Sequence, residues 1–162
     1  MDHSILLLFL FAFTIHNLEE AAWLIRQSSR VSKTKLHKTI TQDQFMFGLF
    51  WVTGLAYLIT ALYMFYPNQE LLKYAYFGYV GCMLLNIVFP HLLVTIIERC
   101  YSPGLLTGIL VILPIHTLII KTGIDSSTIT MSQFIISTLA MAVVLVATIP
   151  LSFMAGKKLI NY

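Results

Sequence analysis

The segment FAFTIHNLEEAAWLI places one histidine and two glutamates, His16, Glu19 and Glu20, inside a predicted membrane-spanning helix. A charged side chain at the centre of such a helix costs roughly 2.5–3.5 kcal/mol, so two adjacent carboxylates require pairing, protonation or a bound cation. At about 100° per residue, Glu19 lies about 60° to one side of His16 and Glu20 about 40° to the other. The three side chains therefore face one direction and predict a metal site or an acid/base site.

The composition of the chain indicates an integral membrane protein. Of its 162 residues, 58% are hydrophobic and only 10% are charged, and the mean hydropathy is +0.83. A soluble domain carries about 25% charged residues, so that class is excluded. Apolar runs of about 20 residues predict five spanning helices, and hence an all-α membrane bundle that forms a single domain over residues 1–162. The predicted spans are residues 5–25, 45–66, 74–97, 104–120 and 132–155.

Basic residues are distributed unevenly between the two sides of the predicted bundle. Only Lys73 and Lys121 fall on the side that carries the N-terminus. By the positive-inside rule, we expect the N-terminus outside and the C-terminus in the cytoplasm of a multi-pass cell-membrane protein. The net charge of +3 then reflects orientation and not nucleic-acid binding. The basic residues on the predicted cytoplasmic side are Arg26, Arg30, Lys33, Lys35, Lys38, Arg99, Lys157 and Lys158.

This orientation allows polar residues on different helices to be compared in depth. At a rise of about 1.5 Å per residue, His91 lies about 9 Å above the cytoplasmic end of its helix, and Glu19 and Glu20 lie about 8–9 Å above theirs. Thr107 falls one turn into the next helix, which begins on the same side. We expect these residues to converge with His16 in the inner half of the bilayer.

Pro90 predicts a kink beside His91. Proline has no N–H, so the carbonyl of Asn86 loses its helical partner, and in lipid that carbonyl needs another one. The Asn86 amide is available to the site or to a neighbouring helix. A similar pair, Pro114 and His116, lies nearer the outer half, where we expect the imidazole to bond a neighbouring backbone.

Taken together, these residues resemble the HXXEE family, a group of membrane proteins of unknown function that is named for its motif. Here the motif reads His16-Asn17-Leu18-Glu19-Glu20. The family's downstream Asn/His element resembles Asn86 and His91, and its Pro-Gly element resembles Tyr101-Ser102-Pro103-Gly104 followed by Thr107. The resemblance covers three of the predicted spans. It implies the site residues but no reaction, because the family has no established activity.

The leading hypothesis is a metal-dependent membrane enzyme that acts on a lipid-like or amphiphilic substrate. Two histidines and one carboxylate suit zinc with an open water position, or non-haem iron. Zinc would support hydrolysis, with the second glutamate as general base, and iron would support oxygen chemistry. The predicted ligands of this divalent metal are His16, Glu19, Glu20 and His91, and the predicted catalytic residues are Glu20, Asn86 and Thr107.

Three other interpretations are open. A His–Glu pair without metal can move protons at neutral pH, as a lipid double-bond isomerase requires. Intramembrane acids and histidines also mark proton or ion pathways, for which five helices would need a homo-oligomer. In a structural role, Glu19 and Glu20 would extend to the interface and pair with Arg26, while His16 and His91 join helices by hydrogen bonds.

Overall fold

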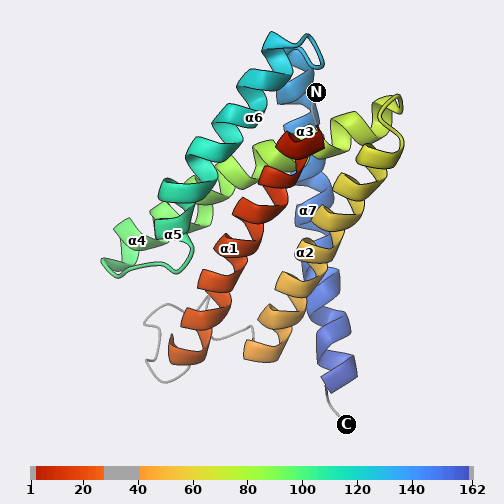
Figure 1. Ribbon diagram of the computed structural model, residues 1–162. Coiled ribbons are helices and arrows are strands. Elements are labelled where there is room, and N and C mark those ends of the chain that lie inside the picture. Colours follow the sequence, from red (N-terminus) through yellow and green to blue (C-terminus); the bar gives the residue numbers. More distant parts are fainter. Residues whose placement is uncertain (1–2, 28–40, 161–162) are drawn as a thin grey trace.

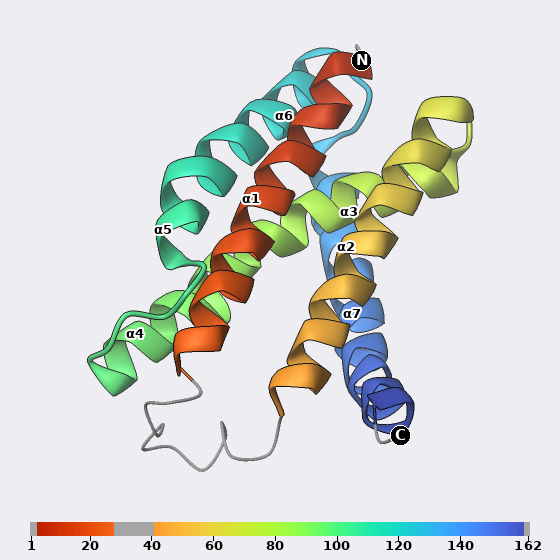
Figure 2. The ribbon, with the colours of Figure 1, turned by 60° about the horizontal axis from the view of Figure 1, so that its bottom comes forward.

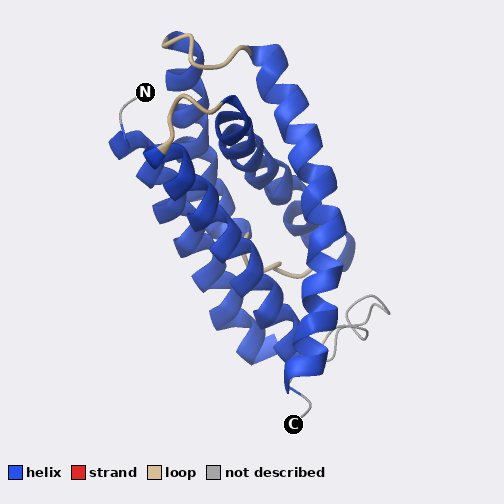
Figure 3. Ribbon diagram, turned by 90° about the vertical axis from the view of Figure 1, so that its right-hand side faces the viewer, coloured by secondary structure: helices blue, strands red, loops and turns tan. Residues whose placement is uncertain are grey.

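The computed structural model describes residues 3–27 and 41–160, apart from the side chains of residues 3, 24–27 and 160. Within these residues every regular element is a helix, and no strand is present (Figure 3). The predicted all-α class and the five predicted spans are confirmed, with bounds that differ from the predicted ones by a few residues. The helices long and apolar enough to cross a membrane are Ser4–Trp23, Gln42–Phe65, Glu70–Glu98, Leu105–Asp125 and Met131–Leu159.

The third and fourth spans each contain a π-helical turn, η2 and η3, so they comprise several elements. Because the described helices cross the bundle an odd number of times, the two chain ends lie at opposite ends of it (Figure 1). We call the end where α1 stops and α2 begins the C-terminal end. The elements are α1 (His3–Gln27), α2 (Gln42–Phe65), α3 (Glu70–Asn86), η2 (Ile87–Leu92), α4 (Leu93–Glu98), α5 (Leu105–Thr107), η3 (Gly108–Ile112), α6 (Leu113–Asp125) and α7 (Met131–Ile160).

The third span is broken where Pro90 predicts a kink. Phe89 has an extended backbone, with φ −131° and ψ 117°, between two helical stretches. A proline inside a helix removes one hydrogen bond and clashes with the preceding turn, which accounts for the break. The break directs η2 and α4 toward α5 and the lower part of α1 (Figure 1). The predicted kink is confirmed.

Two residues in the left-handed backbone region turn the chain sharply between α4 and α5. Arg99 ends α4 with φ 51°, and Gly104 precedes α5 with φ 93°. Glycine adopts this region without steric cost, whereas other residues rarely do. The turn brings the start of α5 back against α1 and η2.

The longest helix, α7, packs along α3 and α2 (Figure 2). Two glycines of α3 make the contact close: a Cβ atom on Gly78 would lie 2.4 Å from the Ser137 carbonyl oxygen, and one on Gly81 would lie 2.0 Å from the Thr138 hydroxyl. Small residues that let backbones approach are typical of helix contacts in membranes. The segment of α3 that leads to the kink is therefore held firmly in place.

An aromatic cluster fills the half of the bundle nearer the N-terminus. The ring of Phe9 lies edge-on to Tyr76 and Tyr79, with centroids 5.5 and 5.6 Å apart. The two phenols donate hydrogen bonds to the carbonyl groups of Leu6 and Val52, so their burial leaves no donor unpaired. This packing holds α1 against α2 and α3 in the half of the bundle nearer the N-terminus.

The predicted orientation in the membrane is a separate matter from the fold. It depends on the basic loop that joins the first two spans, of which residues 28–40 lie outside the described part of the chain. The placement of the N-terminus outside and of the C-terminus in the cytoplasm stays a prediction.

Candidate metal centre

Three side chains bring their ligand atoms together toward the C-terminal end of the bundle. His16 Nε2 lies 3.6 Å, and His91 Nε2 2.9 Å, from the same oxygen, Oε1 of Glu20. One ligand atom of each residue lies within 4.8 Å of the others. The helix period puts His16 and Glu20 on one face of α1, and the kink at Pro90 presents His91 to them. The predicted convergence of these residues is confirmed.

The dimensions of this group suit a single metal ion. Zinc binds histidine nitrogen and carboxylate oxygen at about 2.0–2.2 Å, so neighbouring ligand atoms of a tetrahedral site lie roughly 3.3 Å apart. The two observed separations from the Glu20 oxygen lie on either side of that value. The Glu20 side chain is only 11% exposed. In its ionised form, a carboxylate so buried is stabilised by a positive charge beside it, such as a metal ion or an imidazolium.

Thr107 and Glu19 orient the first imidazole. Thr107 donates both its backbone N–H and its hydroxyl to Glu19 Oε2, at 2.9 and 2.6 Å. Because a hydroxyl has one proton, its oxygen must accept the remaining bond, which joins it to His16 Nδ1 at 3.1 Å. We therefore assign the ring proton to Nδ1 from this network. That leaves Nε2 of His16 unprotonated, the form that can bind a metal.

The loop between α4 and α5 holds the second imidazole. Nδ1 of His91 lies 3.4 Å from the hydroxyl of Ser102. The backbone N–H of Ser102 donates to Thr95 Oγ1 at 3.0 Å, and the Thr95 hydroxyl donates to the carbonyl of His91 at 2.8 Å. The loop is thus fastened to the helix that carries this histidine.

Gly104 brings bare backbone against both imidazoles. A Cβ atom at this position would lie 2.6 Å from Cε1 of His91 and 2.9 Å from Cε1 of His16. Real Cβ contacts are essentially never that short, and the φ of 93° adds strain for any side chain. The two histidines can occupy their observed positions only because this residue is glycine.

Asn86 lies between the two imidazoles. Its Nδ2 is 3.3 Å from His16 Nε2 and 3.0 Å from His91 Nε2. In this orientation the amide donates one hydrogen to each ring nitrogen; turned by 180°, it would present an oxygen to the same place. The structure therefore brings Asn86 into contact with both histidines, and its predicted catalytic role stays a prediction.

Tyr101, in the same loop, is a further donor to Glu19. Its phenol oxygen also accepts a hydrogen bond from the N–H of Leu106 at 3.2 Å. Partial burial, reinforced by the bond to Glu19, raises the pKa of Tyr101 to about 12. The phenol consequently keeps its proton at neutral pH and remains a donor.

Comparisons with known proteins identify the family of this chain. A family model described as a protein of unknown function with HXXEE motif matches residues 7–119, a range that contains the whole site. The chain belongs to this HXXEE family. A relative from Bacillus subtilis (strain 168), the uncharacterized protein YrkK, is 39% identical over 150 residues, which are 93% of this chain and 94% of the relative. No solved structure matches the chain.

The two glutamates of the HXXEE motif have different surroundings. The sequence predicts both as metal ligands, but the structure brings only Glu20 together with the imidazoles. Glu19 projects to the other side of His16 and is occupied by Thr107 and Tyr101. The expected partner of the glutamates in a purely structural role was Arg26, whose side chain lies outside the described residues.

Three site residues of this HXXEE protein were not assigned a role from the sequence. They are Tyr101, Ser102 and Gly104, and all belong to the loop that covers the imidazoles. The signal was present in the Tyr-Ser-Pro-Gly element that resembles the family's pattern. Its function could not be inferred, because only the folded loop shows which side chains it reaches.

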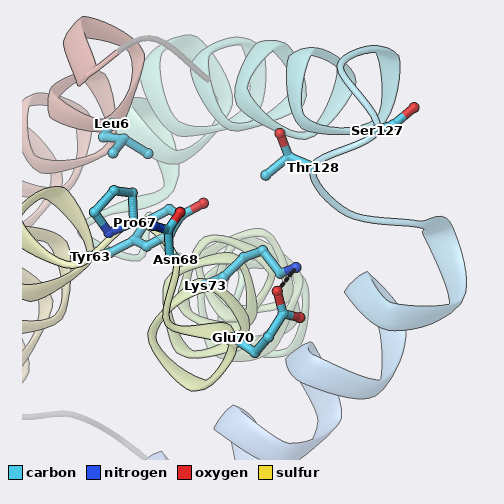
Figure 4. Close-up of a pocket in the computed structure, with 8 residues that line it drawn as sticks. All are labelled: Leu6, Tyr63, Pro67, Asn68, Glu70, Lys73, Ser127 and Thr128. Carbon is cyan, nitrogen blue, oxygen red and sulfur yellow. Dashed lines mark hydrogen bonds and ion pairs between the residues drawn. The ribbon is translucent and has the colours of Figure 1, made fainter.

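Two pockets lie at opposite ends of the bundle. One, of about 450 Å³, lies near the N-terminus and contains the ion pair of Lys73 and Glu70, whose Nζ and Oε1 atoms are 2.7 Å apart (Figure 4). The other, of about 630 Å³, is lined by α1, α2, α3, η2 and α7 and includes Glu20 and Asn86. Two residues of the HXXEE site, Glu20 and Asn86, therefore line the larger pocket.

Proposed function

We propose that this protein is a membrane-embedded metalloenzyme in which His16, Glu20 and His91 bind one divalent metal ion, zinc or iron. The observation that carries the proposal is the convergence of their three ligand atoms within 4.8 Å. Two histidines and one carboxylate with a further position open are typical of catalytic zinc sites and of non-haem iron sites. Structural zinc sites, by contrast, use four protein ligands.

The network around the ligands supports this proposal. Thr107 and Ser102 contact the Nδ1 atoms of His16 and His91, so both Nε2 atoms face the position of the ion. Outer partners of this kind raise metal affinity by fixing ring orientation. In the proposal Glu19 acts through Thr107 and is not itself a ligand.

The reaction class follows from the metal. Zinc would supply a water nucleophile for hydrolysis, and iron would supply oxygen chemistry. Glu20 and Asn86 line both the site and the larger pocket, which supports a lipid-like substrate that approaches from within the membrane. Asn86, which lies against both imidazoles, would then hold an oxygen atom of the substrate.

Elemental analysis of the detergent-purified protein tests the metal site. We expect near-stoichiometric zinc or iron in the wild type, and loss of the metal in Glu20→Gln and His91→Ala. Glu70→Gln is the matched control, because Glu70 lies at the other end of the bundle. A wild type that binds neither metal when both are supplied, or a fully loaded Glu20→Gln variant, would refute the proposal.

The distance of 2.9 Å between His91 Nε2 and Glu20 Oε1 favours metal-free acid/base catalysis as a second candidate. In that case Nε2 of His91 carries a proton and donates it to Glu20, and the Asn86 amide can donate only to His16, because a protonated nitrogen cannot accept. Absence of metal from the wild type, together with a protonated Nε2 in ¹⁵N NMR spectra of His91, would support this candidate instead.

A further inference from the structure

The larger pocket is lined almost entirely by apolar side chains. Its volume of about 630 Å³ lies within the range of roughly 300–1,000 Å³ that is usual for pockets that bind one small molecule. Two helices line it with stripes at helical spacing. The stripes are Phe45, Gly48, Leu49 and Val52 on α2, and Ala142, Leu145, Val146, Ile149 and Phe153 on α7.

The polar lining of the pocket is confined to one region. It comes from Asn17, Glu20 and Asn86, on neighbouring parts of α1 and α3. The amide of Asn17 already donates to the Thr53 hydroxyl at 2.7 Å. Glu20 and Asn86 are the two that also contact the imidazoles, so a ligand that they hold would lie beside the site. No lysine or arginine is among the described residues that line the pocket.

One wall of the pocket is closed and another is open. Met83 and Leu145 are buried, whereas Phe89 and Val146 are 68% and 73% exposed. Both exposed residues lie within spans, where exposed apolar side chains meet lipid. The kink that presents His91 to the site thus also supplies Phe89 to the rim of the pocket.

A hydrocarbon chain gains little from an apolar pocket in a membrane, because lipid tails are equally apolar. Selective binding must come from the polar end of the ligand. A hydroxyl head can donate a hydrogen bond to the carboxylate of Glu20 or to the amide oxygen of Asn86, which removes the cost of burying it. The geometry accordingly favours an amphiphile over a plain hydrocarbon.

We propose that this pocket binds the single hydrocarbon chain of an amphiphile, with its hydroxyl group at Glu20 and Asn86. The chain lies between the stripes of α2 and α7, and it enters laterally past Phe89 and Val146. That this amphiphile is the substrate rests on the proposed function, whereas its binding does not require the metal.

Photo-crosslinking with 1-monopalmitin that carries a diazirine in its acyl chain tests the pocket, with the full chain in phosphatidylcholine nanodiscs. We expect labelled peptides from the α2 and α7 stripes, and much weaker labelling by a diazirine hexadecane that lacks the head. Ala142→Trp fills the pocket and should lower labelling about tenfold, which corresponds to a loss of about 1.4 kcal/mol of binding free energy.

Two valines on α7 provide a matched pair that keeps the test independent of folding. Val146 lines the pocket and is 73% exposed, and Val143 does not line it and is 71% exposed. We expect Val146→Trp to lower labelling and Val143→Trp to leave it unchanged. Equal labelling in both variants, or labels spread over the outer faces of all spans, would overturn the proposal.

Metal analysis of the same samples separates this inference from the proposed function. Labels confined to the pocket in a protein without metal would support the chain-binding site and refute the metalloenzyme. A loaded metal site with labels that ignore Val146→Trp would do the reverse.

Discussion

Both halves of the bundle bury histidines, but only one half gives them acidic neighbours. In the half near the N-terminus, His116 donates from Nδ1 to the Val80 carbonyl at 3.0 Å and packs edge-on against Phe9. The hydrogen bond to a neighbouring backbone is the one that we expect from the sequence. Its Nε2 has no hydrogen-bond partner among the described residues. His16 and His91, in contrast, have polar partners on both ring nitrogens.

The comparison shows that burial and a nearby proline do not by themselves make a histidine a ligand. His91 and His116 share both features in the sequence, and both are buried. They differ in what lies opposite the second nitrogen: a carboxylate oxygen in one case and apolar packing in the other. The proposed metal site therefore depends on Glu20 and on the loop that covers the imidazoles.

The largest expected effect contrasts these two histidines directly. His91→Ala should abolish metal binding, because it removes one of three ligands. His116→Ala should leave metal content unchanged and lower the free energy of unfolding by about 3 kcal/mol, as the truncation of a buried ring does. Elemental analysis and thermal unfolding in detergent measure the two effects. Loss of metal in His116→Ala would erase the distinction between the two halves.

Gly104→Ala should be nearly as severe for the site. The added methyl group collides with both imidazoles. The left-handed backbone lowers the stability of the alanine variant by a further amount of about 1–3 kcal/mol. Gly54→Ala is the control, since a Cβ there meets nothing within 4 Å. We expect metal content to fall sharply only in the first variant. A fully loaded Gly104→Ala protein would show that the loop does not constrain the histidines.

Glu19→Gln sharpens the distinction between the two glutamates. If Glu19 acts through Thr107, its loss should weaken metal affinity about 10–100-fold without abolishing binding, as for other groups that orient a ligand. Competition with a chelator measures this change, with Glu70→Gln as the control. Complete loss of metal, equal to that of Glu20→Gln, would instead make Glu19 a ligand.

Tyr101→Phe should have the smallest effect on the metal. It removes one of several donors to Glu19, worth about 0.5–1.5 kcal/mol. The raised pKa of Tyr101 means that the folded state holds the phenol proton more tightly than the unfolded chain does. Its contribution to stability is therefore complete below a pH of about 10 and is lost as the pH rises toward 12. The free energy of unfolding, measured from about pH 8 to about pH 12, should show this loss in the wild type and not in Tyr101→Phe.

Much of the site could be predicted because helices have a fixed period and rise. These two values place His16 and Glu20 on one face and match the depth of His91. Which residues each glutamate contacts could not be predicted, because these contacts depend on the path of the loop from Arg99 to Gly104. Two left-handed residues set that path.

The sequence by itself determined the membrane class, the five helical spans, the kink at Pro90 and the family, since hydropathy, span length and motif are local properties of the chain. Only the tertiary structure decided that Glu20 meets the imidazoles while Glu19 meets Thr107. It also decided that His116 bonds a backbone carbonyl and that an apolar pocket adjoins the site. These features arise where separate helices meet, and no pattern within one helix specifies its neighbours.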